Sequence, residues 1–139
     1  MMKRATSGQR AATWMASIVL IAAALGCSSG GPDIVPVSGR VTRNGKPVPN
    51  VTIYFHPASG RPSLGECDAD GRFTLRYTHD QDGAKVGNHT VCVVYFPDPS
   101  RGAAPADFKE IAAKYGTPEQ SPLKIEIKKR EPNLEIKLD

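Results

Sequence analysis

Histidines and aspartates gather in the stretch between residues 79 and 89. His79, Asp80 and Asp82 stand close together in the sequence, and His89 follows shortly afterwards. Imidazole nitrogens and carboxylate oxygens are common metal ligands, so these four side chains could converge on an ion and support a small hydrolase or another metal-dependent enzyme. Their spacing matches no established ligand pattern, however, and a polar loop explains them more simply. We therefore predict no metal and no cofactor.

Other signals for catalysis are also weak. The sequence has no P-loop, no H-E-x-x-H and no C-x-x-C, so a phosphate cradle and the usual zinc sites are not indicated. The run Asp68-Ala69-Asp70-Gly71 begins like a calcium loop, but the later oxygen ligands and the bidentate glutamate are missing, and a hairpin turn accounts for it. We predict no catalytic and no cofactor-binding residue, and we expect a protein that is not an enzyme.

Cys27 carries a clearer signal. It ends the run Ala24-Leu25-Gly26-Cys27 after an apolar stretch of about 15 residues, whereas a membrane span needs about 20. Together with the basic start of the chain, this pattern resembles a bacterial lipoprotein signal. The resemblance implies that residues 1–26 are a cleaved signal peptide and that Cys27 is the site of lipid attachment. An uncleaved N-terminal membrane helix is the alternative.

The residues after Cys27 indicate a destination. Several acyl chains on one cysteine hold a protein at a membrane far more firmly than a single myristoyl group does, so this anchor would be permanent. Ser28 stands where the signal for inner-membrane retention has an aspartate. The resemblance therefore favours a cell-envelope protein on the outer membrane, on its periplasmic or surface face. Residues 27–34 form the lipidated cysteine and a flexible stalk.

Removal of the signal peptide lowers the net charge. The whole chain has 18 Lys and Arg against 14 Asp and Glu, a net charge of +4. Three basic residues and no acidic residue lie in 1–26, so the remaining chain carries +1. Nucleic-acid binding requires a clustered basic surface, and this class of function loses its main support.

Residues 35–139 are long enough for one domain, and their pattern is that of strands. Phe73, Leu75 and Tyr77 alternate with Arg72, Thr74 and Arg76, so we expect the first set to face inward and the second to face water. Asn44-Gly45 is typical of a tight hairpin turn. Seven short antiparallel strands at this spacing predict an all-β sandwich. The predicted strands are 37–42, 51–55, 65–67, 72–77, 89–96, 123–128 and 134–138.

Strand 89–96 has apolar residues on both faces. The long segment 97–122 offers a cover for the second face, because Phe108, Ile111, Ala112 and Tyr115 recur at helical spacing within residues 106–115. We predict a short helix or ordered loop that lies on the sheet there. The alternative is an exposed apolar patch for a partner protein.

Four segments of the sequence, Val37–Thr42, Asn44–Val51, Asp68–Leu75 and Val86–Val91, carry a family resemblance. They resemble carboxypeptidase-regulatory-like domains with the transthyretin (prealbumin) fold. The later residues 111–123 and 134–138 are similar to a subgroup of small bacterial lipoproteins built from one such domain. The resemblance implies a seven-stranded Greek-key β-sandwich.

The same resemblance bears on function. The hydroxyisourate hydrolase that shares this fold ends in Tyr-Arg-Gly-Ser, whereas this chain ends Glu135–Asp139, so that activity is not expected. We expect a monomeric, non-enzymatic binding or structural module. Its partners are the membrane, through the N-terminal lipid, and an envelope protein or glycan that the sequence does not identify.

Cys67 and Cys92 are the cysteines that remain once Cys27 is acylated, in a compartment where disulfides persist. A bridge between them would close a loop of 26 residues and add roughly 3–4 kcal/mol of stability. If Val91 and Val93 point into the core, Cys92 lies on the opposite face, and a bridge needs Cys67 on that face within about 7 Å. We therefore favour two buried free thiols over the disulfide.

Overall fold

The computed structural model describes residues 31–139, a range that contains every predicted strand. The predicted signal peptide, Cys27 and the beginning of the stalk lie outside the described residues. In the part of the chain that is described, no helix is both long enough and apolar enough to cross a membrane.

Strands dominate the structure, so the prediction of an all-β domain is confirmed. Each of the predicted ranges overlaps a strand, but the described chain is divided into more and shorter segments than we expected. In chain order, they are β1 (Ile34–Val35), β2 (Val37–Arg43), β3 (Lys46–Pro47), β4 (Thr52–Pro57), β5 (Ser63–Glu66), β6 (Arg72–Thr74), β7 (Arg76–Thr78), β8 (Gln81–Asp82), β9 (Ala84–Lys85), β10 (Gly87–Val94), α1 (Phe108–Tyr115), β11 (Lys124–Ile127) and β12 (Glu131–Leu138).

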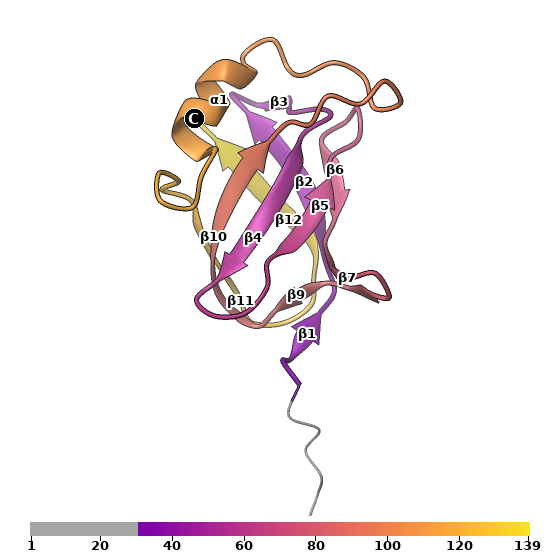
Figure 1. Ribbon diagram of the computed structural model, residues 1–139, viewed down its shortest axis with the longest axis vertical. Helices are drawn as coiled ribbons and strands as arrows, with labels where there is room; N and C mark the ends of the chain where they lie inside the picture. The colour runs from indigo at the N-terminus through magenta and orange to yellow at the C-terminus, as the bar shows by residue number, and fades with distance from the viewer. Residues whose placement is uncertain (1–30) are drawn as a thin grey trace, which may run out of the picture. The chain divides into compact units, whose positions relative to one another are not determined.

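Two larger sheets face each other across the core (Figure 1). One sheet has the strand order β11-β10-β4-β5-β7-β8, and the other has the order β12-β2-β3, with β6 also paired to β2. β1 and β9 form a small sheet of their own at one end, whereas α1 and the C-terminal residue lie at the opposite end (Figure 1). The arrangement is consistent with a β-sandwich.

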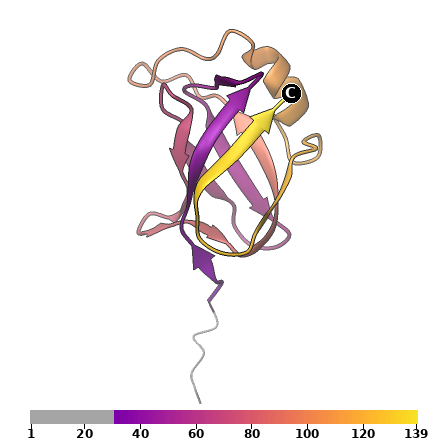
Figure 2. The same ribbon diagram turned by 180° about the vertical axis from the view of Figure 1, so that it is seen from behind.

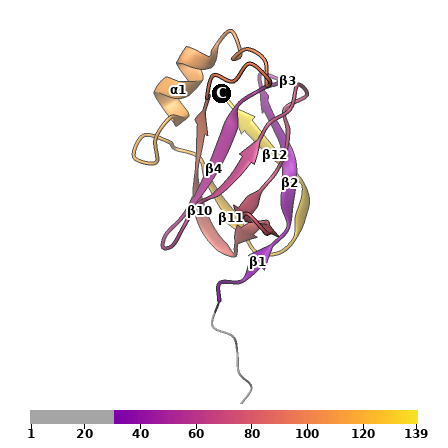
Figure 3. The same ribbon diagram turned by 45° about the vertical axis from the view of Figure 1, so that its right-hand side comes forward.

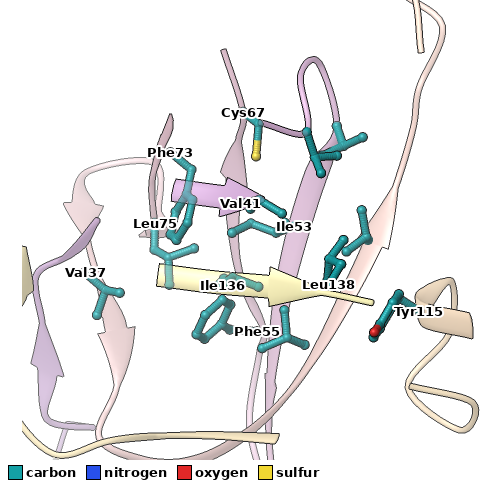
Figure 4. Packing of buried hydrophobic residues seen from close by; sticks show 14 of the residues in the cluster. Val37, Val41, Ile53, Phe55, Cys67, Phe73, Leu75, Tyr115, Ile136 and Leu138 are labelled. Carbon is teal, nitrogen blue, oxygen red and sulfur yellow. The ribbon is translucent and has the colours of Figure 1, made fainter. Parts of the chain in front are cut away.

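Alternating strand positions build the core between the sheets. Val41 of β2 and Ile136 of β12 are almost fully buried, and they pack in one cluster with Ile53 and Phe55 of β4 (Figure 4). Burying a side chain of this size contributes about 1.5–3 kcal/mol, so the cluster holds the two sheets together. The period-two pattern also fixes which side chains stay outside.

The two predicted turns are present. Asn44 and Gly45 have φ values of 51° and 78° where β2 turns into β3, as the Asn-Gly pair predicts. At the second turn, an Asp68 carboxylate oxygen accepts hydrogen bonds from the backbone N–H groups of Asp70 and Arg72, both at 2.9 Å. That carboxylate therefore stabilises the turn itself.

The single strand predicted at residues 72–77 is instead two strands in different sheets. β6 pairs with β2, and β7 pairs with β5. Between them, the Leu75 N–H donates to the Val37 carbonyl at 2.8 Å and the Leu75 carbonyl accepts from Gly83 at 2.7 Å. The apolar alternation continues through Leu75 because both sheets present their inner faces to the same core, so the pattern does not reveal the change of sheet.

The prediction that all strands are antiparallel is wrong for β12. This strand runs parallel to β2, and the two lie side by side in the view from behind (Figure 2). Antiparallel neighbours are usually joined by short turns, which the sequence can reveal, whereas β2 and β12 are separated by most of the domain.

Gly39 makes the contact between β2 and β12 feasible. The register of the pair shifts between Glu131 and Leu134, and there the Leu134 carbonyl approaches β2. A Cβ atom at residue 39 would lie 1.9 Å from that oxygen, so no larger residue fits without movement of the backbone.

The predicted helix is present, but it packs on a different face from the one expected. Ile111 and Tyr115 of α1 belong to the core cluster that contains Val93. On the second face of β10, Cys92 is buried, but Phe96 farther along remains 53% exposed. The helix lies beside β10 (Figure 3). Its apolar side chains extend the core, because β11 pairs only with the first half of β10 and leaves room beside the rest of that strand.

Ion pairs join α1 to the ends of two strands. The Arg43 guanidinium at the end of β2 contacts the carboxylates of Asp107 and Glu110 at 2.6 and 2.9 Å, and these hydrogen bonds raise its pKa. Lys114 and the Tyr115 hydroxyl both donate to the Asp139 carboxylate, and these bonds lower the pKa of that side chain to about 2.

Candidate functional site

The structure does not bring the predicted metal ligands together. His79 and Asp80 lie on the turn between β7 and β8 with side chains that are 94% and 97% exposed, and their closest ring nitrogen and carboxylate oxygen are 3.9 Å apart. The Asp82 carboxylate is 3.7 Å from the Arg76 guanidinium. These residues form a solvated polar turn.

His89, the fourth candidate, is in the core instead. It is 2% exposed, its Nε2 lies 2.6 Å from the Lys85 carbonyl oxygen, and its Nδ1 has no hydrogen-bond partner among the described residues. The ring packs against Phe55 with 5.6 Å between ring centroids. Strand alternation with Val91 and Val93 explains this inward position, and the sequence contained that signal. Across residues 31–139, no group of three or more His, Cys, Asp and Glu side chains could hold a metal ion.

The two described cysteines are free and buried in different surroundings. Cys67 belongs to the core cluster, whereas Cys92 lies outside that cluster, opposite Tyr54 in the β10–β4 ladder. Burial raises the pKa of Cys67 to about 12 and also raises the pKa of Cys92. Both thiols are therefore protonated at neutral pH, the form that is a poor nucleophile.

His56 lies on the outer face of the six-stranded sheet. Its ring stacks on Tyr54 with 5.9 Å between centroids, and Thr90 is its neighbour on β10. Partial burial lowers the pKa of His56, an effect that the negative charge of Glu119 partly opposes.

Polar side chains gather instead around β6, where two hollows open on the surface. The first has a volume of about 430 Å³ and is lined by residues of β5, β6 and β7. The second has a volume of about 400 Å³ and is lined by residues of β2, β6 and β12. Both share Arg72, Phe73 and Thr74, so we treat them as one feature, the β6 groove. Its other lining residues are Leu64, Glu66, Asp68 and Arg76 in the first hollow, and Ser38, Gly39, Arg40, Pro132, Asn133, Leu134 and Glu135 in the second.

Strand alternation and one irregularity shape the groove. Ser38 and Arg40 on β2 and Arg72 and Thr74 on β6 are the outward-facing neighbours of core residues. At the register shift in β12, the Ser38 hydroxyl donates to the Pro132 carbonyl at 3.0 Å, which fixes this segment of β12 beside the second hollow.

The groove offers both donors and acceptors. Arginine side chains supply the donors, and Glu66, Asp68 and Glu135 supply carboxylate oxygens. Such a surface can bind a polar ligand by hydrogen bonds. The sequence pattern identified Arg72, Thr74 and Arg76 as an outward set, but it missed the groove, because Arg40 and Arg72 become neighbours only through the pairing of β2 with β6.

Comparison with protein-family models, curated proteins and solved structures finds no match to this chain.

Proposed function

We propose that this chain is a monomeric, non-enzymatic binding module that a lipid on Cys27 tethers to the cell envelope. The β6 groove is the observation that carries the binding role, because it gathers hydrogen-bonding side chains of both kinds on one accessible surface. The groups with potential for catalysis lie apart from one another, and burial keeps both described thiols protonated.

We also propose a transthyretin-like Greek-key sandwich of the carboxypeptidase-regulatory-like kind. Its support is the agreement between the motif phrases and the local structure. Asn44 and Gly45 adopt the positive φ values of a tight turn, and Asp68–Gly71 is a turn stabilised by the Asp68 side chain. Val37, Val41 and Phe73 occupy core positions.

The tether we propose is the lipid on Cys27, with the outer membrane as its destination. The described chain enters the domain at β1, and α1 lies at the other end (Figure 1). Ser28 after the cysteine supports the outer membrane over the inner one.

Replacement of Cys27 with alanine tests the tether. We expect Cys27→Ala to abolish labelling by a palmitate analogue in a bacterial host and to move the protein from the membrane fraction to the soluble fraction, because the thiol is the acceptor of the lipid. Ser28→Ala changes the adjacent residue and should retain both labelling and membrane association. Labelling that persists in Cys27→Ala contradicts the proposal.

A further inference from the structure

Two arginines lie directly opposite each other in the β6 groove. Arg40 of β2 and Arg72 of β6 are register partners in an antiparallel pair, and both side chains are exposed on the same face. Like charges at directly opposed positions destabilise a sheet. The stability of the fold therefore does not explain why these two arginines lie opposite each other.

Carboxylates of the domain do not neutralise this pair. Within residues 31–139, neither guanidinium lies within ion-pair distance of an acidic side chain. The Arg40 Nε donates to the Asp70 backbone carbonyl at 3.0 Å. The Arg72 side chain makes no hydrogen bond within residues 31–139. Glu135 is the register neighbour of Arg40 on β12, but its carboxylate lies 3.7 Å from Lys137. Most donors of both guanidinium groups are therefore available to a ligand.

The planar fork of a guanidinium matches the two oxygens of a carboxylate, and two such forks side by side provide a strong site for one acidic group. Around this pair, the second hollow provides the Thr74 hydroxyl and the Asn133 amide, which can both donate and accept hydrogen bonds. The Ser38 hydroxyl, whose proton is donated to the Pro132 carbonyl, can still accept one. The carboxylates of Glu66, Asp68 and Glu135 line the same groove and accept hydrogen bonds only.

This mixture favours one chemical class of ligand. A ligand with a negative charge on every unit and no hydroxyl groups would be repelled by the three carboxylates. A sugar acid presents one carboxylate together with several hydroxyls, which can donate to those same carboxylates. Both hollows are lined by Arg72, Phe73 and Thr74, and each has a volume of about 400 Å³ or more, so sugar units beside the bound carboxylate can extend from the second hollow toward the first.

We propose that Arg40 and Arg72 jointly bind the carboxylate of an acidic saccharide, and that adjoining sugar units lie along the β6 groove. This inference rests on the proposed binding role and names the ligand class for the same site.

Calorimetric titration of the full chain in a nonionic detergent tests the inference. The probe is a tetrasaccharide with one glucuronic acid and three neutral glucose units, compared with the same tetrasaccharide after reduction of its carboxyl group to an alcohol. We expect the wild-type protein to bind the acidic form and to bind the reduced form at least about ten-fold more weakly, because hydrogen bonds to charged groups are the stronger ones. This comparison uses the unaltered protein and does not depend on the folding of a variant.

Two variants locate the site. Arg40→Gln and Arg72→Gln should each weaken binding of the acidic tetrasaccharide by about ten-fold or more. Arg61→Gln removes the same charge from a residue that packs over Tyr77 outside both hollows, and it should bind like the wild type. Circular dichroism on each variant checks that the fold is intact.

Several outcomes would overturn the inference. They are equal binding of the acidic and reduced forms, absence of binding to the acidic form, and equal loss of binding in Arg61→Gln. Tetraglutamate that binds as tightly and with the same dependence on Arg40 and Arg72 would overturn the saccharide class in favour of an acidic peptide. Saccharide binding that is unchanged in both arginine variants overturns this site, but the proposed binding function stands. The Cys27→Ala test of the tether is independent of all these results.

Discussion

At the scale of single residues, burial decides the chemistry of Cys67 and Cys92. Both thiols are free and buried, and burial raises both pKa values. In the Cys27→Ala variant, where these are the remaining cysteines, we expect no reaction with a thiol reagent in the native protein at neutral pH. After unfolding without reductant, the same reagent should count two thiols, because the sulfurs become accessible and their pKa values return to the ordinary range.

A reduced sample of that variant, unfolded in the same way, is the control and should give the same count. If the unreduced monomer shows no thiols and the reduced one shows two, Cys67 and Cys92 are bridged and the buried free thiols are refuted.

His56 makes stability depend on pH. Partial burial lowers its pKa below the ordinary value of 6.5, so the unfolded chain binds a proton more readily than the folded protein does. Acid therefore favours unfolding. The contribution of neutral His56 to stability is complete above the ordinary pKa of 6.5 and is lost as the pH falls through the lower pKa of the folded state. We expect His56→Gln to reduce the fall in the free energy of unfolding between about pH 8 and about pH 5, as measured by urea unfolding.

The alkaline end of the same titration is the internal control. Above about pH 7.5, His56 is neutral in both states, so the difference in stability between His56→Gln and the wild type should not vary with pH. A difference that is also constant down to about pH 5 would show that His56 does not contribute to the acid sensitivity.

At the scale of elements, the pairing of β2 with β12 depends on Gly39. A Cβ atom there would lie 1.9 Å from the Leu134 carbonyl oxygen, so we expect Gly39→Ala to force the strands apart and to lower the free energy of unfolding by about 1–3 kcal/mol in urea. Gly31→Ala is the matched control, because an added Cβ meets nothing within 4 Å there. If the two variants are equally stable, the close approach of the strands does not exist in solution.

The elements also show why part of the fold was predictable. The strand positions, the Asn44-Gly45 turn and the α1 helix follow from local patterns, which a sequence carries in consecutive residues. The split of the predicted strand at Leu75 and the parallel direction of β12 were missed, because both depend on pairing between segments far apart in the chain. The face covered by α1 was wrong for the same reason: β11 pairs with only part of β10, and local periodicity does not show this.

The candidate site follows the same division. Alternation predicted that Arg72, Thr74 and Arg76 point outward, and it could have placed His89 in the core. It could not reveal that Arg40 lies opposite Arg72, since that contact exists only after β2 and β6 have paired. A groove made from five strands is a product of tertiary structure, and composition and spacing do not encode it directly.

At the scale of the whole molecule, the domain has two different ends and a polar side. The chain enters at β1, the α1 end carries the ion pairs of Arg43 and Asp139, and the β6 groove lies over strands between them.

The late position of β12 also controls when the chain can fold. β2 is the first long strand, and its parallel neighbour becomes available only after residue 138 has been made, so the four-stranded sheet cannot be completed before that point. Contacts between such distant segments slow folding, because a long loop must close before the contact stabilises anything. Under the export that we propose, the chain would cross the membrane before its two sheets are complete, and it would acquire its final sheet once β12 has arrived on the far side.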